Sequence, residues 1–507
     1  MWTNLLNRIR KALYKMNLIR GLKKVSDVKD IPAADEQYIR IAMWKALYTG
    51  FYQPFHKVTY QTVNGQKTRQ MASLGMAKVA AQEIATLVFN EKCMVNISDK
   101  QLQTNIDDVF KQNCFSREFQ RYLEYQFALG GLALKVFVEN GKIKISFVTA
   151  DNFVPLSWNH DNITEGVFVN EFYKNGIKYT HLEWNLFNNG IYTIRNELYE
   201  SKHGEELGVK IPLNALFPDL QPETIIENVE RPFFAYIKPN TANNIDMNSP
   251  LGISIYANAV DTLRAIDTAF DSFEREFKLG KKRILVPASA IRQVVDPTTG
   301  AMTRYFDAND EVYEAFNFDD SMNRIEDISV ELRVEEHIAA LNALLTHFSM
   351  QIGFSAGAFT FDAAGLKTAT EVISENSKTF RTKQAHETIV EAGLQELVKI
   401  IVDVAELYGI FPAPAGEYDV TVTFDDSIAE DKATNANYYI LLSSSGLVSK
   451  VFAMQKILGL TEEQAKQMLQ EINNENATVQ GENIDLFGPE TGGDNSGAIA
   501  GFGGGGA

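Results

Sequence analysis

Two long amphipathic segments that bracket a short insert constrain the fold of this 507-residue chain more than any other feature. The first begins at Ser249-Pro250, a favourable pair for a helix N-terminus, and places apolar residues every three or four positions as far as Gly280. The second repeats this spacing over 334–352. Between them lie short strand-like runs separated by turn residues. Because each helix has one apolar stripe to bury, the pattern predicts two helices that pack on partners and carry a small α/β module between their ends.

Before this helix pair the sequence predicts a mixed α+β region. Helical spacing covers about 31–90 and 101–129, and strand-like runs fill 130–200. Asn-Gly pairs interrupt these segments, and Asn-Gly suits the two positive φ angles of a tight hairpin turn. The pairs are Asn64-Gly65, Asn140-Gly141, Asn175-Gly176 and Asn189-Gly190. We therefore expect one hairpin within the first helical region and an antiparallel meander over 130–200.

After the helix pair, residues 353–365 form a glycine-punctuated loop that contains three phenylalanines. A third helix is predicted from the capping box at 368–371 to about Tyr408, and Gly409 ends it. Its middle, 374–388, is so polar that we expect it to span a surface or a subunit boundary. The chain continues with a strand at 418–424, helices over 427–473 and a glycine-rich tail that we expect to be disordered.

The first 30 residues carry eight Lys or Arg against two acids, with apolar residues on one helical face. This basic amphipathic helix is either a docking arm or a helix packed on its own protein, or else a membrane-surface or targeting helix. Basic residues interrupt every apolar run there, so no secretory signal is expected. Cys93 and Cys114 alone form no disulfide framework and have no zinc-binding spacing, which indicates a cytosolic protein with reduced thiols.

The chain is acidic, with 48 Lys and Arg against 65 Asp and Glu and a net charge of −17. A protein that gripped nucleic acid over its whole surface would be expected to be basic. The charge therefore argues against a protein that binds DNA over its whole surface. One basic position is the end of the first long helix, where 275–283 nets +4. Ordinary capping of a helix C-terminus explains that cluster equally well.

The catalytic motifs in this sequence lack the context that their chemistry needs. Gly353 to Gly357 matches GxSxG, but a nucleophile elbow has a strand before its serine and a helix directly after it. Here a helix precedes Ser355 and a loop follows, and the next histidine, His386, lies in a polar helix. No Gly-Lys pair has Walker spacing, and the histidines do not form a metal motif. We expect no enzyme activity, no cofactor and no metal.

Residues 338–361 carry no formal charge over a length that could span a bilayer. Several polar side chains and two helix-breaking glycines argue against a membrane helix. A run without charge could equally line a passage through which a polyanion slides without being held.

The opening of the first long helix (249–256), its basic end (281–283), the bracketed insert and the segment 361–382 together resemble bacteriophage portal proteins. The closest resemblance is to the SPP1/A118-like type, especially in 365–375, and the order of elements is similar over about 30–475. The resemblance implies a helix-rich, mixed α+β protein that forms a ring, usually of twelve subunits, at one vertex of the capsid. Such a head-to-tail connector is the channel for packaging and ejecting double-stranded DNA.

The resemblance also assigns regions by position. These are an N-terminal arm (1–30), wing (31–248), first stem helix (249–283), clip (284–328), second stem helix (329–353), tunnel loop (354–366), long wing helix and strand (367–426), helical crown (427–475) and disordered tail (476–507). The implied DNA-channel candidates are Lys278, Lys281, Lys282 and Arg283 at the end of the first stem helix, and Phe354, Phe359, Phe361 and Lys367 in and beside the tunnel loop.

The partners that the resemblance implies are the terminase large subunit, the major capsid and scaffolding proteins, and head-completion or adaptor proteins. Assembly would take place in the cytoplasm of the bacterial host, with no membrane involved. Two alternatives remain at this point: a pore that inserts into membranes or another ring channel, suggested by the uncharged run, and a serine hydrolase with Ser355 as its nucleophile.

Overall fold

The computed structural model describes residues 28, 31, 35–62, 65–160, 162–201, 206–280, 284–285, 292–295, 302–305, 326–327, 331–361, 377–424, 432–458, 460 and 462–482. Most of the predicted arm and insert, the capping box at 368–371 and the tail from 483 onward lie outside these residues. The chain divides into two compact units, Met1–Asp425 and Asp426–Ala507.

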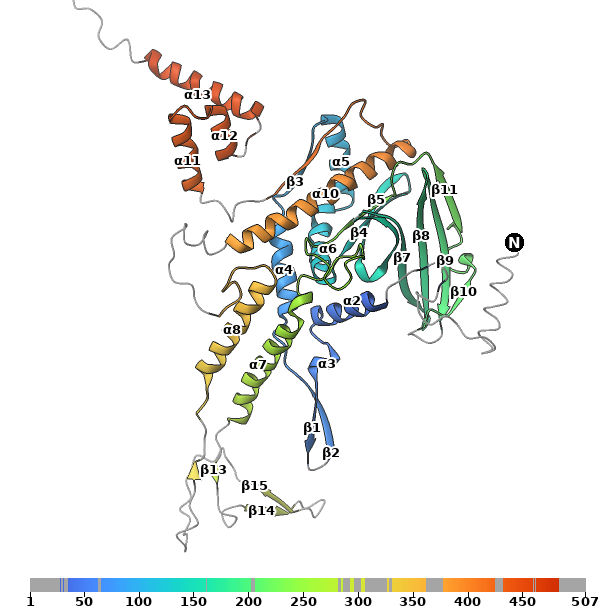
Figure 1. The fold of residues 1–507 in the computed structure, drawn as a ribbon, viewed down its shortest axis with the longest axis vertical. Helices are drawn as coiled ribbons and strands as arrows, with labels where there is room; N and C mark the ends of the chain where they lie inside the picture. The colour runs from blue at the N-terminus through green and yellow to red at the C-terminus, as the bar shows by residue number, and fades with distance from the viewer. Residues whose placement is uncertain are drawn as a thin grey trace, which may run out of the picture. The chain divides into compact units, whose positions relative to one another are not determined.

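Helices and antiparallel sheets both contribute to the larger unit, as predicted (Figure 1). Its helices are α2 (Asp35–Tyr48), α3 (Gln53–His56), α4 (Met76–Val88), α5 (Lys100–Gln112), α6 (Phe115–Leu129), α7 (Val260–Leu279), α8 (Val334–Gln351) and α10 (Ser377–Leu407), with 3-10 turns η2 (Ala150–Asn152), η3 (Leu213–Ala215) and η4 (Ala257–Ala259). Its strands are β1 (Lys57–Thr62), β2 (Gly65–Gln70), β3 (Met94–Ile97), β4 (Leu132–Glu139), β5 (Lys142–Thr149), β6 (Phe153–Asn159), β7 (Asn162–Lys174), β8 (Ile177–Asn188), β9 (Ile191–Ser201), β10 (Val209–Ile211), β11 (Glu223–Glu227), β12 (Phe234–Ile237), β13 (Ile284–Leu285), β14 (Arg292–Val295), β15 (Met302–Tyr305), β16 (Glu326–Asp327) and β17 (Val420–Thr423).

The Asn-Gly pairs mark hairpins as predicted. Asn140, Asn175 and Asn189 all have positive φ and are each followed by a positive-φ glycine, and each pair joins two strands of one sheet. The hairpin β1–β2 also forms, and Gly65 is the first residue of its second strand. The residue before Gly65 lies outside the described part of the chain.

The strands over 130–200 form two sheets rather than one meander. The order in the smaller sheet is β12-β4-β5, and in the larger it is β10-β9-β8-β7-β6 with β11 also paired to β9. The break falls at η2, where Ala150 and Phe153 turn into the core. Phe153 stacks on Tyr236 of the smaller sheet (5.2 Å between centroids) and also contacts Phe168 of the larger (5.1 Å). Burial of this aromatic cluster explains why the chain changes sheet here.

The main core lies where α4, α6 and α10 meet each other and the smaller sheet (Figure 1). Phe119 of α6 meets Phe89, which follows α4, edge to face with centroids 4.8 Å apart. Leu394 and Leu397 of α10 are completely buried in the same cluster. α4, α6, α10 and the smaller sheet thereby form one body, to which α7 and α8 are attached.

The first long helix begins at Val260, not at Ser249 as predicted. Residues 249–256 are irregular, and their backbone passes tightly against the end of α6: a Cβ on Gly252 would lie 2.5 Å from the carbonyl oxygen of Gly130. The backbone N–H of Ile255 donates to the carbonyl of Phe127 (3.1 Å). The apolar residues in this segment whose spacing predicted a helix, Leu251, Ile253 and Ile255, are therefore buried by tertiary contacts and not as one face of a helix. The predicted end at Gly280 is confirmed.

One face of the polar middle of α10 is buried inside the subunit, which the sequence did not predict, while Ser377, Arg381, Gln384 and Thr388 are exposed, as expected of a helix that lies at a surface. Lys383, His386 and Glu387 are 2%, 4% and 7% exposed. Lys383 Nζ lies 2.6 Å from Glu387 Oε1, and His386 Nδ1 accepts a hydrogen bond from the backbone N–H of Asn240 (3.1 Å). Polar groups can be buried when they satisfy one another in this way.

The second unit consists, in its described part, of three helices: α11 (Lys432–Ser444), α12 (Lys450–Leu458) and α13 (Glu462–Glu482). Gly446 has a φ of +74° just after α11, where the chain turns toward α12. α12 contacts both other helices, and Ala453 and Ala465 are buried between them. Helices were predicted here, although α13 extends beyond the expected limit of 473.

Candidate functional site: the α7–α8 helix pair and its loop

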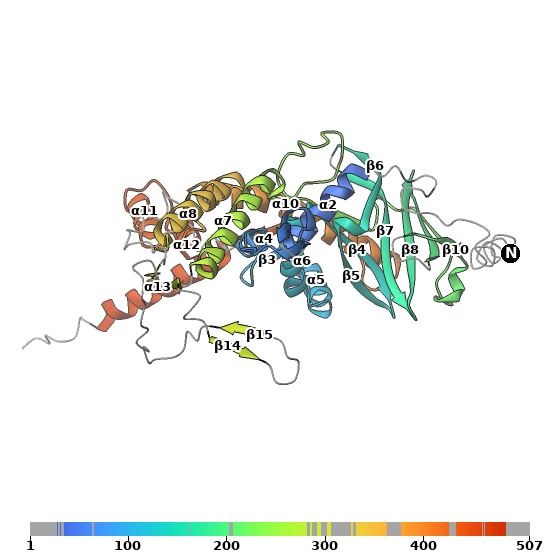
Figure 2. The same ribbon diagram turned by 90° about the horizontal axis from the view of Figure 1, so that it is seen from below.

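The helices α7 and α8 lie side by side in both views of the molecule (Figures 1 and 2). Near the body, Thr262 Oγ1 donates to Gln351 Oε1 (2.7 Å). Farther along, the rings of Phe273 and His337 are 5.3 Å apart. The N-terminal half of α7 and the C-terminal half of α8 thus pack where the body begins, and the opposite ends of both helices lead to the insert.

The ends next to the insert are joined by an ionic cluster on Glu276. Arg333 donates to this carboxylate through its guanidinium (2.9 Å and 3.2 Å) and through its backbone N–H (2.9 Å), and His337 Nε2 also contacts it. These hydrogen bonds lower the pKa of Glu276 to about 2, and those from the Arg333 side chain have the largest effect. At Gly280, an added Cβ would lie 2.5 Å from Leu332 Cδ2. The two segments that lead into and out of the insert are therefore fixed against each other.

The opposite face of α7 holds the β1–β2 hairpin through two buried carboxylates. His56 Nδ1 accepts from the backbone N–H of Tyr52 (2.8 Å), so Nε2 is the nitrogen that donates to Asp267 Oδ2 (2.9 Å). Asp267 Oδ1 also accepts from the backbone N–H of Leu74 (2.8 Å). Asp267 thereby binds both ends of the hairpin.

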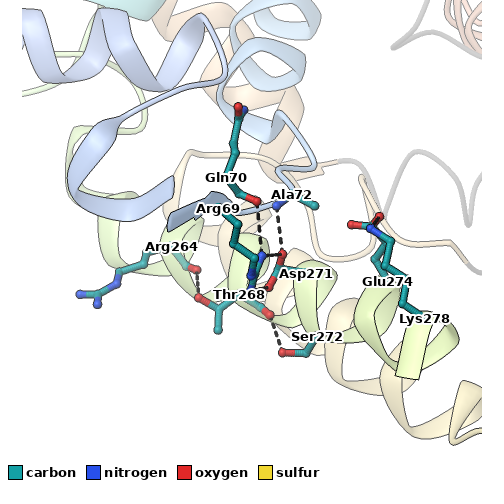
Figure 3. Close-up of polar contacts among 9 residues, drawn as sticks. All are labelled: Arg69, Gln70, Ala72, Arg264, Thr268, Asp271, Ser272, Glu274 and Lys278. Carbon is teal, nitrogen blue, oxygen red and sulfur yellow. Dashed lines mark hydrogen bonds and ion pairs between the residues drawn. The ribbon is translucent and has the colours of Figure 1, made fainter. Parts of the chain in front are cut away.

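One turn farther along α7, Asp271 binds the second strand of the hairpin. Both of its oxygens accept from the Arg69 guanidinium at 2.6 Å, and Oδ1 accepts from the backbone N–H of Ala72 at 3.1 Å (Figure 3). The hydrogen bonds from Arg69 lower the pKa of Asp271. Bidentate Arg–carboxylate pairs fix orientation as well as distance, so the hairpin is rigidly aligned with α7.

The loop after α8 is anchored to α10 by a ladder of hydrogen bonds. Thr382 Oγ1 donates to the carbonyl of Gly353 (2.7 Å), and Lys378 Nζ donates to the carbonyl of Met350 (2.6 Å). Ser355 and Thr379 exchange two bonds, in which each backbone N–H donates to the other's hydroxyl (2.8 Å and 3.2 Å). The first part of the loop is therefore fixed to the body.

The structure separates the predicted site residues. Phe354 is only 4% exposed and belongs to the main core, and the half-buried Phe359 packs on it with centroids 5.1 Å apart. Neither ring projects from the surface of the subunit. Phe361 is 57% exposed, and Lys278 is exposed and paired with Glu274 (Figure 3). Lys281, Lys282, Arg283 and Lys367 lie outside the described residues.

Ser355 does not have the environment of an exposed nucleophile. It is 3% exposed, and its hydroxyl accepts from the backbone of Thr379 and lies 3.1 Å from Thr379 Oγ1. His386 bonds elsewhere, to Asn240. In the described part of the chain, no group of three or more His, Cys, Asp or Glu side chains could hold a metal ion. Among the helices that the structure describes, none combines the length and apolarity needed to cross a bilayer.

Asp267 and Asp271 are the positioning residues that sequence reasoning missed. Two carboxylates four positions apart on one helix face, beside an apolar stripe, are a readable signal. The matching signal is the hairpin 57–70, which carries three cations and no acid. Both signals were present in the sequence, but only the structure pairs them.

The comparisons with known proteins agree with this architecture. The family model for the phage portal protein, SPP1 Gp6-like, matches residues 28–478. The chain therefore belongs to this family of phage portal proteins, which are structural proteins of a capsid vertex. The resemblance drawn from the sequence is thereby confirmed. No curated protein matches the chain.

Two solved structures are similar in fold. One is the neck of an empty GTA particle computed with C6 symmetry, with 12% identity, a TM-score of 0.43, and coverage of 76% of this chain and 90% of that chain. The other is the virion of a native gene transfer agent (GTA) particle, with 11% identity, a TM-score of 0.38, and coverage of 76% and 89%.

Proposed function

We propose that copies of this chain form a closed ring, of twelve subunits by the family resemblance, through which double-stranded DNA is packaged and ejected. The observation that carries the proposal is the family match over 28–478 together with the joined α7–α8 pair. A helix pair that is fixed at both ends and projects from a large body can pack side by side with the same helix pair of neighbouring subunits. Copies arranged around an axis leave no open edge.

In this proposal α7 and α8 are the stem, 284–328 the clip, 354–366 the tunnel loop and 427–475 the helical crown. The remaining folded part, with α10, is the wing. The ionic cluster at Glu276 supports this division, because it fixes the segment that leads into the clip against the segment that leads out of it.

DNA would contact the ring without sequence specificity, through phosphates at the basic stem end and through the loop. Phe361 is the exposed candidate among the loop phenylalanines, while Phe354 and Phe359 would act by holding the loop to the body. Lys278, Lys281, Lys282 and Arg283 would repeat around the ring as a belt of positive charge, and Lys367 would lie beside the loop.

The proposed partners are those of a capsid vertex: the terminase large subunit, the major capsid and scaffolding proteins, and head-completion or adaptor proteins. The chain would assemble in the bacterial cytoplasm and act without enzyme activity, cofactor or membrane. The burial of Ser355 supports a structural role for the GxSxG segment rather than catalysis.

Electron microscopy of the purified chain tests the proposal. We expect end-on views of closed rings with a central hole, and no flotation of the protein with liposomes. A monodisperse monomer under every assembly condition would contradict the ring, and flotation would favour the alternative of a membrane pore.

A further inference from the structure

Side chains, not further strands, close several sheet edges in the larger unit. On the outer edge of β3, Gln103 Oε1 accepts from the backbone N–H of Ile97 (2.6 Å), and Gln103 Nε2 donates to the carbonyl of Val95 (3.1 Å). Two side chains of α10 bind the outer edge of β17 in the same way. An open strand edge can pair with any extended chain, and these contacts prevent such pairing.

The outer edge of β5 is closed only over its first half. There Asn113 Nδ2 donates to the carbonyl of Ile143 (3.0 Å), and Asn113 Oδ1 accepts from the backbone N–H of Ile145 (3.2 Å). Backbone groups of alternate residues point to the same edge of an antiparallel strand, so Phe147 and Thr149 also turn theirs away from β4. No strand of the described chain pairs with this edge.

A second open edge, that of β7, lies nearby. β6 pairs with β7 only as far as Phe168, whereas β8 pairs with β7 as far as Lys174. β5 and β7 are neighbours in Figures 1 and 2. A cleft of about 610 Å³ is lined by residues 146–149 of β5 and 168–170 of β7. This volume falls within the range of about 300–1,000 Å³ that is typical of binding clefts.

The two faces of β5 give the cleft two different sides. Phe147 points to the side of α6, where the ring of Tyr122 stacks on it with centroids 5.0 Å apart. Lys135 of β4 pairs with Ser146 of β5, the residue before Phe147, and therefore lies on the opposite face. There Lys135 Nζ is bound to Glu183 Oε2 (2.7 Å). Three tyrosines of α2 and α6 line the cleft: Tyr48, Tyr122 and Tyr125.

The charge of β5 indicates the kind of segment that fits beside it. The strand carries Lys142 and Lys144 and no acid, in a chain whose net charge is −17. Both lysines lie on the same face as Ser146, because side chains alternate along a strand. An extended segment that pairs with the open half of the edge would place every second side chain on the tyrosines. The others would lie on the polar face, where acidic side chains at one end meet the lysines.

We propose that the open half of the β5 edge binds an extended segment of another protein, which adds as a strand beside Phe147. The segment has apolar residues at alternate positions, which lie on the tyrosines, and an acidic end at Lys142 and Lys144. In strand addition, backbone hydrogen bonds supply affinity and alternate side chains supply specificity. The inference goes beyond the proposed ring and does not depend on it, because the contact joins the chain to a different protein.

A synthetic peptide tests strand addition. The probe is fluorescein-labelled Val-Thr-Val-Thr-Val-Glu-Glu, which places its acids at Lys144 and Lys142 when it runs antiparallel to β5. We expect the purified full-length chain to bind it with a dissociation constant of about 1 mM or lower, measured by fluorescence anisotropy. N-methylation of the middle valine removes the N–H that pairs with Phe147 and should weaken binding about tenfold. Equal binding of both peptides, or no binding of the first, would overturn the proposal.

Thr149 allows the backbone itself to be tested. Its φ of −72° and ψ of 157° are compatible with proline, so Thr149→Pro removes the outward N–H without forcing a new backbone conformation. Thr149→Val is the matched control, because it also loses the hydroxyl but retains the N–H. We expect about tenfold weaker peptide binding for Thr149→Pro than for Thr149→Val. Equal affinities of the two variants would mean that the peptide does not pair with this edge.

Hydrogen exchange identifies the occupant. The amide of Phe147 should exchange rapidly in the purified chain and about tenfold more slowly with saturating peptide, because strand pairing protects it. Slow exchange in the purified chain alone would show that a segment of the chain itself or of a second copy already covers the edge. That result would overturn the proposal of a different protein, whether or not the chain forms rings.

Exchange of charge tests the acidic end of the segment. Lys142→Glu/Lys144→Glu should weaken binding of the probe, and a peptide with two lysines in place of its glutamates should bind this variant better than the unmodified chain. Lys78→Glu/Lys100→Glu makes the same change at exposed positions of α4 and α5 and should bind both peptides like the unmodified chain. Unchanged binding by Lys142→Glu/Lys144→Glu would contradict the acidic end.

Discussion

His386 is the residue whose burial has the clearest consequence in solution. Burial lowers its pKa from 6.5 to about 4, and its Nδ1 accepts a hydrogen bond from the backbone of Asn240. Between pH 6.5 and 4 the unfolded chain takes up a proton on this imidazole that the folded chain does not. The free energy of unfolding therefore falls as the pH decreases through that window, by about 3 kcal/mol for this group, and His386 has no such effect above it.

The measurement is the urea midpoint at pH 7.5 and at pH 4.5, for the unmodified chain and for His386→Gln. Glutamine retains an acceptor for Asn240 but does not titrate, so the difference between the two midpoints should shrink. His160→Gln, at an exposed position, is the control. An unchanged pH dependence in His386→Gln would show that other groups cause the acid sensitivity.

At the scale of elements, the sequence predicted best where one residue type determines the backbone. Asn140-Gly141 forms a hairpin turn as predicted, between β4 and β5, and the predicted ends of the helices at Gly280 and Gly409 agree with the ends of α7 and α10. The prediction failed where contacts between segments far apart in the sequence determine the local structure. Residues 249–256 have helical spacing, but the close approach of Gly130 and Gly252 keeps them irregular. One polar face of α10 is buried because Lys383 pairs with Glu387 and His386 binds the backbone of Asn240, a segment far away in the sequence.

The anchor of the loop after α8 gives a prediction at this same scale. Gly353 has a φ of +91°, and an added Cβ would lie 2.7 Å from Cγ2 of Thr382. The hydroxyl of the same threonine donates a hydrogen bond to the Gly353 carbonyl. Gly357 has a similar φ of +84°, but its nearest neighbour would be 3.8 Å away. Both alanine variants have to adopt a left-handed backbone, at about 1–2 kcal/mol. Only Gly353→Ala also has to displace Thr382, which adds about 1–3 kcal/mol.

We therefore expect Gly353→Ala to lower the thermal midpoint more than Gly357→Ala. It should also accelerate amide exchange over 353–361, because the ladder between the loop and α10 is weakened. Equal effects of the two substitutions would mean that Thr382 does not hold the loop.

At the scale of the whole molecule, the charge of −17 is compatible with a portal protein because a conduit must not retain what it passes. Twelve such subunits would repel DNA wherever it is not confined and neutralised. The sequence located the helix pair and its basic end from local periodicity and composition. It could not show that Phe354 lies in the core, because that burial depends on how the loop folds back between α8 and α10.

The basic end of the first stem helix gives the prediction for the assembled molecule. We expect Lys281→Gln/Lys282→Gln/Arg283→Gln to form rings as the unmodified chain does, since these residues are proposed to contact phosphates and not neighbouring subunits. Particles assembled with this variant should retain less DNA, and the remaining retention should depend less on salt, because fewer counterions are released per contact. The measurement is nuclease-protected DNA per particle over a series of salt concentrations.

Lys278→Gln is the matched control, because the Lys278 ammonium is already paired with Glu274 on its own helix. If the triple variant instead fails to form rings, the cluster acts as a cap of the helix C-terminus and not on DNA.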